Sequence, residues 1–288
     1  MNTIQNLVLA GIDGSSLTNA VCDYAAWIAQ KVDAPLKLLH TIDHHPEHAH
    51  STDITGNIGV DSRDHLLDEL TQLEQQRSKL RLLQGKQLLQ AASERVRQAG
   101  VLDPITNQRH GSLVESLIEL ENDLRVLVIG VRGKVHENQP DKIGAKLESI
   151  IRSLHKPILV VNAEFKAPER IMLAYDGSPA AEKALEMVAT SPLYKGLTCH
   201  LVCVSQDEGK GQLLEVAANK LHLAGGIEVI AKKLVGKPEL VLAEYQEQKG
   251  IDMTVMGAFG HTRIHDWLLG SFTVKMLTQS YKPLLLLR

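Results

Sequence analysis

The sequence predicts an α/β protein built from two tandem copies of one domain, each an open parallel five-stranded sheet flanked by helices in a Rossmann-like arrangement. Short apolar runs alternate with helical patterns, which is typical of βα units covered by helices on both faces. Three segments also recur along the chain, namely 7–15 as 171–178, 126–130 as 253–257, and 156–161 as 282–287. With 288 residues, each half is long enough to bury a core of its own.

The elements follow from these runs in chain order. In the second copy, strands are expected at 170–175, 198–204, 227–232, 253–256 and 284–287, with helices in the gaps. Pro179 and Pro238 each suit a first helical position, where the missing N–H removes no helical hydrogen bond. In the first copy, Ser112 and Glu115 predict a capping box for a helix that runs to about Glu121.

The two copies join near residues 162–169, so we expect one domain at 1–163 and the other at 167–288. The first copy carries an insertion at about 44–99. Asp13 and Asp176 are 163 residues apart and Gly130 and Gly257 are 127 apart, so the first copy has 163 − 127 = 36 extra residues. These residues lie between its second and third strands.

A polar loop rich in histidine and a long helical stretch, about 61–99, make up this insertion. As one straight helix the stretch would be about 58 Å long, at 1.5 Å per residue. Its apolar stripe changes phase, so we expect a break or bend near 78–85. Two alternatives stay open for its first segment, which either projects against another domain or subunit or packs on its own sheet.

Charge, cysteine content and the length of the apolar runs argue against several classes of protein. A net charge of −3 gives no sign of a nucleic-acid or anionic-membrane footprint. The three cysteines form no CxxC pair, which favours reduced thiols over a disulfide framework. The first residues lack a signal-peptide pattern, and no apolar run reaches 18 residues. We therefore expect a cytoplasmic protein that neither spans a membrane nor binds nucleic acid.

The strongest functional signal follows the strand expected at 253–256. Gly257 and Gly260 let the backbone turn where a side chain would block it. Gly270 and Ser271 then open a helix, whose unpaired N–H groups and partial positive charge suit a phosphate. The spacing G-x2-G-x9-G-S is more specific than a bare glycine pair. The alternative interpretation is a strand-to-helix loop that needs its glycines only for the turns.

This spacing resembles the universal stress protein family, whose nucleotide-binding members carry Gly-x2-Gly-x9-Gly-(Ser/Thr) after their fourth strand. The resemblance covers nearly the whole chain apart from the insertion. It implies an adenine nucleotide, ATP with or without Mg²⁺, whose phosphates and ribose lie among the glycines, Ser271 and Thr273, and whose base and ribose contact Asp176. Asp176 also suits a cap of the next helix. The residues expected to bind the nucleotide are Ala174, Tyr175, Asp176, Val204, Met256, Gly257, Gly260, His261, Gly270, Ser271, Phe272 and Thr273.

The first copy departs from the motif. Gly130 and Gly133 are kept, but ten residues then precede Gly144, and Ala145-Lys146 follow it where the motif has a hydroxyl. Asp13 survives. We expect this copy to bind no nucleotide, or another ligand, which leaves one competent site in the second copy.

These features predict an ATP-binding regulatory protein of the stress response. No water-activating base with an orienting partner is evident, so any ATPase activity should be slow. One alternative is a slow ATP hydrolase. Another is an interaction scaffold or zinc-binding protein that uses the histidine-rich segment 40–50, with His44, His45 and His48 as the zinc candidates. A homodimer stays open, and the sequence names no protein partner.

Overall fold

The computed structural model describes residues 6–43, 60–133, 145–258 and 270–288. The first copy contributes β1 (Leu7–Gly11), α1 (Thr18–Val32), β2 (Leu36–Ile42), α2 (Val60–Gln98), β3 (Ile105–His110), α3 (Leu113–Leu120), η1 (Glu121–Asp123), β4 (Leu124–Gly130), α4 (Ala145–Ser153) and β5 (Ile158–Val161). The second copy contributes β6 (Arg170–Ala174), α5 (Pro179–Thr190), η3 (Pro192–Tyr194), β7 (Thr198–Val204), α6 (Lys210–Ala224), β8 (Glu228–Leu234), α7 (Pro238–Gln248), β9 (Met253–Gly257), α8 (Ser271–Gln279) and β10 (Leu284–Leu287).

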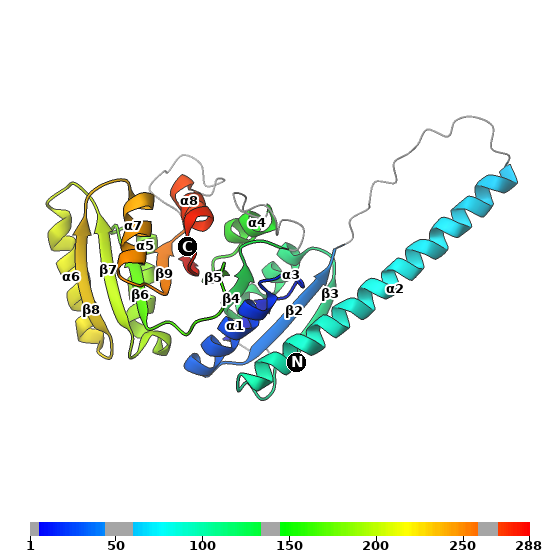
Figure 1. Cartoon of the computed structure of the whole chain (residues 1–288), viewed down its shortest axis with the longest axis horizontal. Coiled ribbons are helices and arrows are strands. Elements are labelled where there is room, and N and C mark those ends of the chain that lie inside the picture. Colours follow the sequence, from blue (N-terminus) through cyan, green and yellow to red (C-terminus); the bar gives the residue numbers. More distant parts are fainter. Residues whose placement is uncertain (1–5, 44–59, 134–144, 259–269) are drawn as a thin grey trace.

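The predicted α/β fold and its parallel half-sheets are confirmed, and the strands expected in the second copy lie within two residues of their observed ends. The two half-sheets join edge to edge into one sheet with the order β3-β2-β1-β4-β5-β10-β9-β6-β7-β8 (Figure 1). At the join β5 and β10 run antiparallel, with Leu284 opposite Val160 and Leu286 opposite Ile158. All other neighbouring strands are parallel. The join therefore relates the two copies by an approximate two-fold axis.

Alternating residues of the strands supply a core on each face of the sheet. Helices α1, α2, α5 and α6 pack on one face, and α3, α4, α7 and α8 pack on the other. Each core runs through both copies. Leu159 and Leu285 belong to one, while Val160 and Leu284 belong to the other. Burial of these side chains is what fuses the halves, since apolar area removed from water is the main stabilising contribution.

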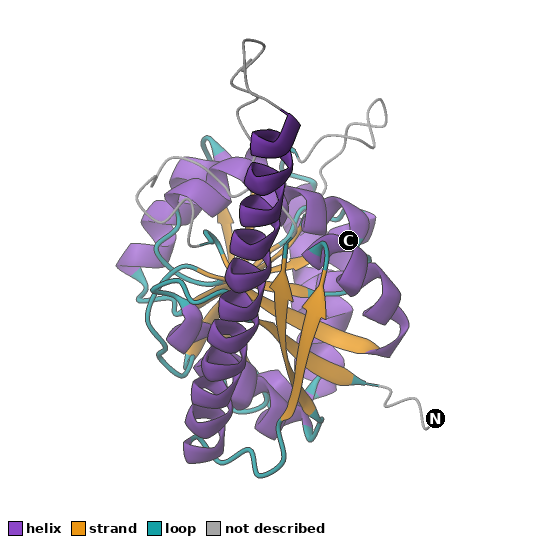
Figure 2. Ribbon diagram, turned by 90° about the vertical axis from the view of Figure 1, so that its right-hand side faces the viewer, coloured by secondary structure: helices purple, strands orange, loops and turns teal. Residues whose placement is uncertain are grey.

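Helix α2 is one unbroken helix of 39 residues, so the expected break near 78–85 is wrong. Its last part packs on the domain, where Leu89 and Val96 are buried and Arg95 pairs with Asp23 of α1. Its first part leaves the domain and projects away from the sheet (Figures 1 and 2). The projecting part does not pack on the domain. Its apolar stripe can therefore lie on another face of the helix without a bend in the helix axis.

Gly85 has a packing role at the point where α2 meets the sheet. A Cβ at this position would lie 2.3 Å from Nε2 of Gln108 and 2.7 Å from Cδ2 of His40. The glycine thus allows a close approach of the helix to β2 and β3, where the sequence suggested only a breaker.

The helix starts expected at Pro179 and Pro238 are confirmed. Helix α3 also begins directly after Ser112, but the Ser112 side chain makes no capping hydrogen bond, so the predicted capping box is wrong. The helix starts through main-chain bonds, the first from the Ser116 N–H to the Ser112 carbonyl oxygen (3.1 Å).

One buried carboxylate fastens the segment that connects the two copies. Asp252 is 4% exposed and accepts hydrogen bonds from Lys166 Nζ (2.7 Å) and from the N–H groups of Glu169 (3.0 Å) and Arg170 (3.1 Å). Burial alone would raise the pKa of Asp252, but these three hydrogen bonds outweigh it and hold the pKa below its usual value. The connection is therefore held at the amino end of β9.

Replacing this carboxylate should weaken the fold. Asp252→Ala leaves two backbone N–H groups without their acceptor, and we expect the free energy of unfolding to fall by about 2–4 kcal/mol. Lys166→Met is the matched control, because the Lys166 side chain is 66% exposed and should contribute less than about 1 kcal/mol. Urea unfolding of both variants measures the difference, and equal losses would contradict the role of Asp252.

His200 should make stability depend on pH. It is buried in β7, and its Nδ1 lies 2.9 Å from the Tyr245 hydroxyl. Burial, then the charges of Lys249 and Arg170, lower its pKa below the usual 6.5. The unfolded chain therefore binds this proton more readily, and stability is lost as pH falls below about 6.5.

The non-titrating variant His200→Asn, whose amide can replace Nδ1, should lose less stability than the wild type between pH 7.5 and 5. Urea unfolding at several pH values measures both slopes. Identical slopes would show that His200 does not contribute.

Candidate functional site

The strand order places one candidate crevice in each half. In the second half β6 and β9 are neighbours whose chain connections leave in opposite directions, and ligands of open α/β sheets bind at the carboxyl ends of such strands. Ala174 lies opposite Met256 in the register of these two strands. Residues 175–176 and 257–258 therefore leave the sheet side by side.

Asp176 shapes the turn after β6 and keeps its carboxylate exposed. Its Oδ1 accepts the Ser178 N–H (2.9 Å), and Gly177 adopts φ +79°. Ser178 then caps α5 by accepting the Ala181 N–H (3.2 Å). The N-cap of α5 is therefore Ser178 and not Asp176, which shapes the turn before the helix and keeps its carboxylate exposed at the edge of the crevice.

Helix α8 begins at this same edge. Its N-cap is Gly270, which has no side chain to cap the helix. The Val274 N–H donates a main-chain hydrogen bond to the Gly270 carbonyl oxygen (3.1 Å). The N–H groups of residues 271–273 therefore have no acceptor within the helix. Ser271 is exposed. An anion at this point would meet N–H donors and the positive end of the helix dipole.

Thr273 holds α8 in place. It is 1% exposed, and its hydroxyl donates to the Ala258 carbonyl oxygen at 2.5 Å. This bond ties the first turn of α8 to the end of β9. Because the only hydroxyl hydrogen is used there, Thr273 has no side-chain donor left for a ligand.

Gly257 is required by packing. A Cβ there would lie 2.8 Å from Cβ of Ala180 and 3.3 Å from its carbonyl carbon, so α5 could not approach β9 as it does. Gly260 and His261 fall outside the described residues.

The remaining predicted site residues divide by burial. Ala174, Val204 and Phe272 are partly buried beside one core, so part of each side chain lies at the surface. Met256 is 1% exposed and packs in that core. Tyr175 is buried, and its hydroxyl donates to the Glu182 carboxylate. Burial and this bond raise the pKa of Tyr175 above its usual range, so the phenol stays neutral.

A cation that the sequence motifs did not predict lies at the crevice. Lys210, the first residue of α6, donates from Nζ to the main-chain oxygen of Asp176 (2.7 Å). Lys233 of β8 donates to the main-chain oxygen of Asp207, near the start of the same helix. The sequence does contain a signal for Lys210, because this residue is basic and lies in the first turn of the helix after the second strand of its copy.

The first half keeps the same turn. Asp13 Oδ1 accepts the Ser15 N–H (3.0 Å), as Asp176 does for Ser178. Leu88 lies against Gly14 as Leu213 lies against Gly177, which aligns α2 with α6 at an offset of 213 − 88 = 125. By this offset Gly85 occupies the position of Lys210, since 210 − 85 = 125.

An ion pair crosses the crevice of the first half. Lys146 in the first turn of α4 pairs with Asp43, which follows β2. Since β1 lies between β2 and β4, this pair spans the carboxyl end of β1. Gly133 also lies over Asp13, because a Cβ there would be 3.1 Å from Asp13 Oδ2. The described part of the first half thus places an ion pair of its own beside the Asp13 turn.

In the described part of the chain, no three His, Cys, Asp or Glu side chains gather closely enough to hold a metal ion. His40 is engaged with the main chain, its Nδ1 lying 2.7 Å from the Ile12 carbonyl oxygen. The zinc candidates His44, His45 and His48 lie outside the described residues. The three cysteines are buried and free, as expected.

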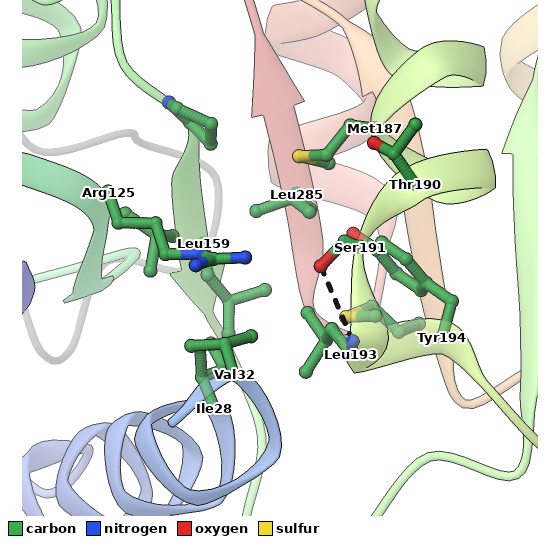
Figure 3. A pocket seen from close by; sticks show the side chains of 13 residues that line it. Ile28, Val32, Arg125, Leu159, Met187, Thr190, Ser191, Leu193, Tyr194 and Leu285 are labelled. Carbon is green, nitrogen blue, oxygen red and sulfur yellow. Dashed lines mark hydrogen bonds between the residues drawn. The ribbon is translucent and has the colours of Figure 1, made fainter. Parts of the chain in front are cut away.

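A cavity of about 230 Å³ lies between the two copies (Figure 3). Arg125 reaches toward it from the first copy, facing Ser191 and Tyr194 of the second. Its walls are largely apolar. Because Val126 and Met253 line it near the amino ends of β4 and β9, it lies at the opposite edge of the sheet from the crevice.

Among the helices of the described residues, none is both long and apolar enough to cross a membrane. The sequence pattern of the universal stress protein family matches residues 6–162 and 204–288. The universal stress protein Slr1230 of Synechocystis sp. is 33% identical over 288 residues, which is 99% of this chain and 100% of that protein.

Two further proteins are similar. The universal stress protein MJ0577 of Methanocaldococcus jannaschii is 32% identical over 89 residues, 29% of this chain and 55% of that one. The crystal structure of a universal stress protein from Archaeoglobus fulgidus DSM 4304 superimposes with a TM-score of 0.72 at 20% identity, and the match covers 100% of this chain and 99% of that one. The repeat, the fold and these matches agree, and the chain belongs to the universal stress protein family as a tandem, two-domain member.

Proposed function

We propose that this protein is an ATP-binding regulatory protein of the stress response, with one nucleotide site in the domain that we place at 167–288. The observation that carries the proposal is the meeting of three features at one edge of the sheet. These are the uncapped start of α8 at Gly270, the exposed Asp176 carboxylate after β6, and the ammonium group of Lys210.

The start of α8 suits the phosphates. An anion at an exposed helix start gains about 0.3–1 kcal/mol, so one contact would be too weak and several must act together. The Ser271 hydroxyl adds an exposed donor, and Lys210 adds a charge at the same edge. Thr273 supports this arrangement through its bond to Ala258, which holds α8 in position.

The other end of the crevice suits a nucleoside. The Asp176 carboxylate can accept a hydrogen bond from a ribose hydroxyl or a purine amine, as the acidic residue of dinucleotide folds does. Ala174 and Val204 offer apolar surface at the ends of β6 and β7. We expect Mg²⁺ to accompany the phosphates when present, with nucleotide occupancy, not rapid turnover, as the signal.

By the same criteria, the first half is not expected to hold an equivalent nucleotide site. Lys146 pairs with Asp43 across its crevice, and Gly85 lies where the second half has Lys210. One equivalent of ATP per chain is therefore expected.

A matched pair of aspartate variants tests the proposed contact. Asp176→Asn keeps the Oδ1 that accepts the Ser178 N–H but removes the charge. Loss of a charge-assisted hydrogen bond of about 1.5–3 kcal/mol should weaken ATP binding by roughly 10- to 100-fold. Asp13→Asn makes the same change at the same turn of the first half and should leave affinity unaltered. Titration calorimetry measures both, and equal effects would contradict a single site in the second half.

A graded series at Gly270 tests the phosphate end. The residue has φ −56°, which any amino acid can adopt, so substitution should leave the fold intact. Gly270→Ala should weaken ATP binding less than Gly270→Val, which should abolish the single equivalent because its branched side chain blocks the helix start. Both variants should lose less affinity for adenosine, which has no phosphate, than for ATP. Unchanged ATP binding by Gly270→Val would overturn the proposed placement of the phosphates.

A further inference from the structure

The projecting part of α2 exposes a stripe of leucines. Leu70, Leu73 and Leu80 are 48%, 52% and 57% exposed, and their spacing of three and seven residues puts them on one face of the helix. Figure 1 shows that this part of the helix extends away from the sheet and the other helices. The stripe therefore faces solvent within one chain.

This face is not a continuation of the one that covers the sheet. At 3.6 residues per turn, the stripe lies about a third of a turn from the face of Leu89, Ala92 and Val96, which are buried against the domain. One helix thus carries two apolar faces, one for each of its parts. A helix without tertiary packing is marginal in water, so the second face calls for a partner.

The charges along the helix indicate what that partner is. Residues 69–76 contain Glu69 and Glu74 and no basic residue. Residues 77–86 contain four basic residues and no acidic one, namely Arg77, Lys79, Arg81 and Lys86. A parallel copy of this helix would place like charges together, whereas an antiparallel copy places the acidic part beside the basic part. The segment is complementary to itself when reversed.

The leucine spacing agrees with this reversal. In an antiparallel pair centred on residue 75, Leu70 lies opposite Leu80 of the second copy, and Leu73 lies opposite its Arg77. The aliphatic stem of Arg77 can cover Leu73 while its guanidinium reaches Glu74 of the second copy. Such an interface is two-fold symmetric, because each contact occurs twice.

We infer that two copies of this chain dimerise by antiparallel pairing of their projecting α2 segments, centred on residue 75. The join between β5 and β10 lies inside one chain and stays unchanged. The crevice of the second half lies at a distance from α2 and needs no residue from the second copy, so this pairing and nucleotide binding can be tested separately.

Analytical ultracentrifugation of the full chain tests the surface. We expect a mass of twice 31.7 kDa that falls to one chain on dilution. Leu73→Glu places a charge in the middle of the stripe and should raise the dimer dissociation constant at least tenfold. Gln75→Glu is the matched control, because it introduces the same carboxylate on the opposite, exposed face of the helix and should have little effect. A wild type that stays monomeric at every concentration, or equal effects of the two variants, would overturn the inference.

Single cysteine variants test the direction of pairing. Gln76→Cys lies next to the centre, so it should form a disulfide-linked dimer under mild oxidation. Leu83→Cys should not, because in the antiparallel pair the two sites are separated by about 24 Å, or 16 residues at 1.5 Å. The native cysteines are buried and should stay unreactive. Efficient cross-linking through both variants would indicate a parallel pair and overturn the antiparallel one, and failure of Gln76→Cys would overturn the register.

Discussion

The structure depends on the antiparallel pairing of β5 with β10. Each of these strands would otherwise be the edge of a half-sheet, with unpaired N–H and C=O groups. Leu284 opposite Val160 and Leu286 opposite Ile158 close that edge within one chain. Because both cores run through the join, the two copies form one ten-stranded sheet, and the only outer edges among the described strands are β3 and β8.

This arrangement explains how two equivalent halves come to differ in chemistry. The Asp13 and Asp176 turns are equivalent, each with its aspartate bonded to the N–H two residues on. The differences lie in the elements that surround these turns. Lys210 is replaced by Gly85, and α4 starts with a lysine that pairs across the crevice. A shared scaffold is thus kept for stability, since both halves contribute to each core, while one half retains the groups suited to an anion.

The long helix α2 shows the same separation between packing and interaction. Its last part is an ordinary crossover helix, equivalent to α6, and the close approach at Gly85 sets where it meets the sheet. The difference in length is 39 − 15 = 24 residues, and these extra residues are the part that leaves the domain. These residues do not pack on the sheet. Their apolar stripe and segregated charges are therefore available for contacts with another molecule.

The sequence by itself determined the elements and the family, because these depend on patterns that are local or repeated. Alternation of apolar runs and helical stretches located the strands, and the repeated LAYDGS-like segment identified the tandem copies. The G-x2-G-x9-G-S spacing predicted the candidate site at Gly257 to Thr273.

Only the tertiary structure decided which groups meet, since such contacts join residues that are far apart in the chain and leave no local periodicity. It placed Lys210 against Asp176 and Lys146 against Asp43. It directed the Thr273 hydroxyl to Ala258, and it showed that Gly257 is required by the approach of Ala180. It also left α2 straight, because a change in stripe phase bends a helix only when both faces must pack on the same body.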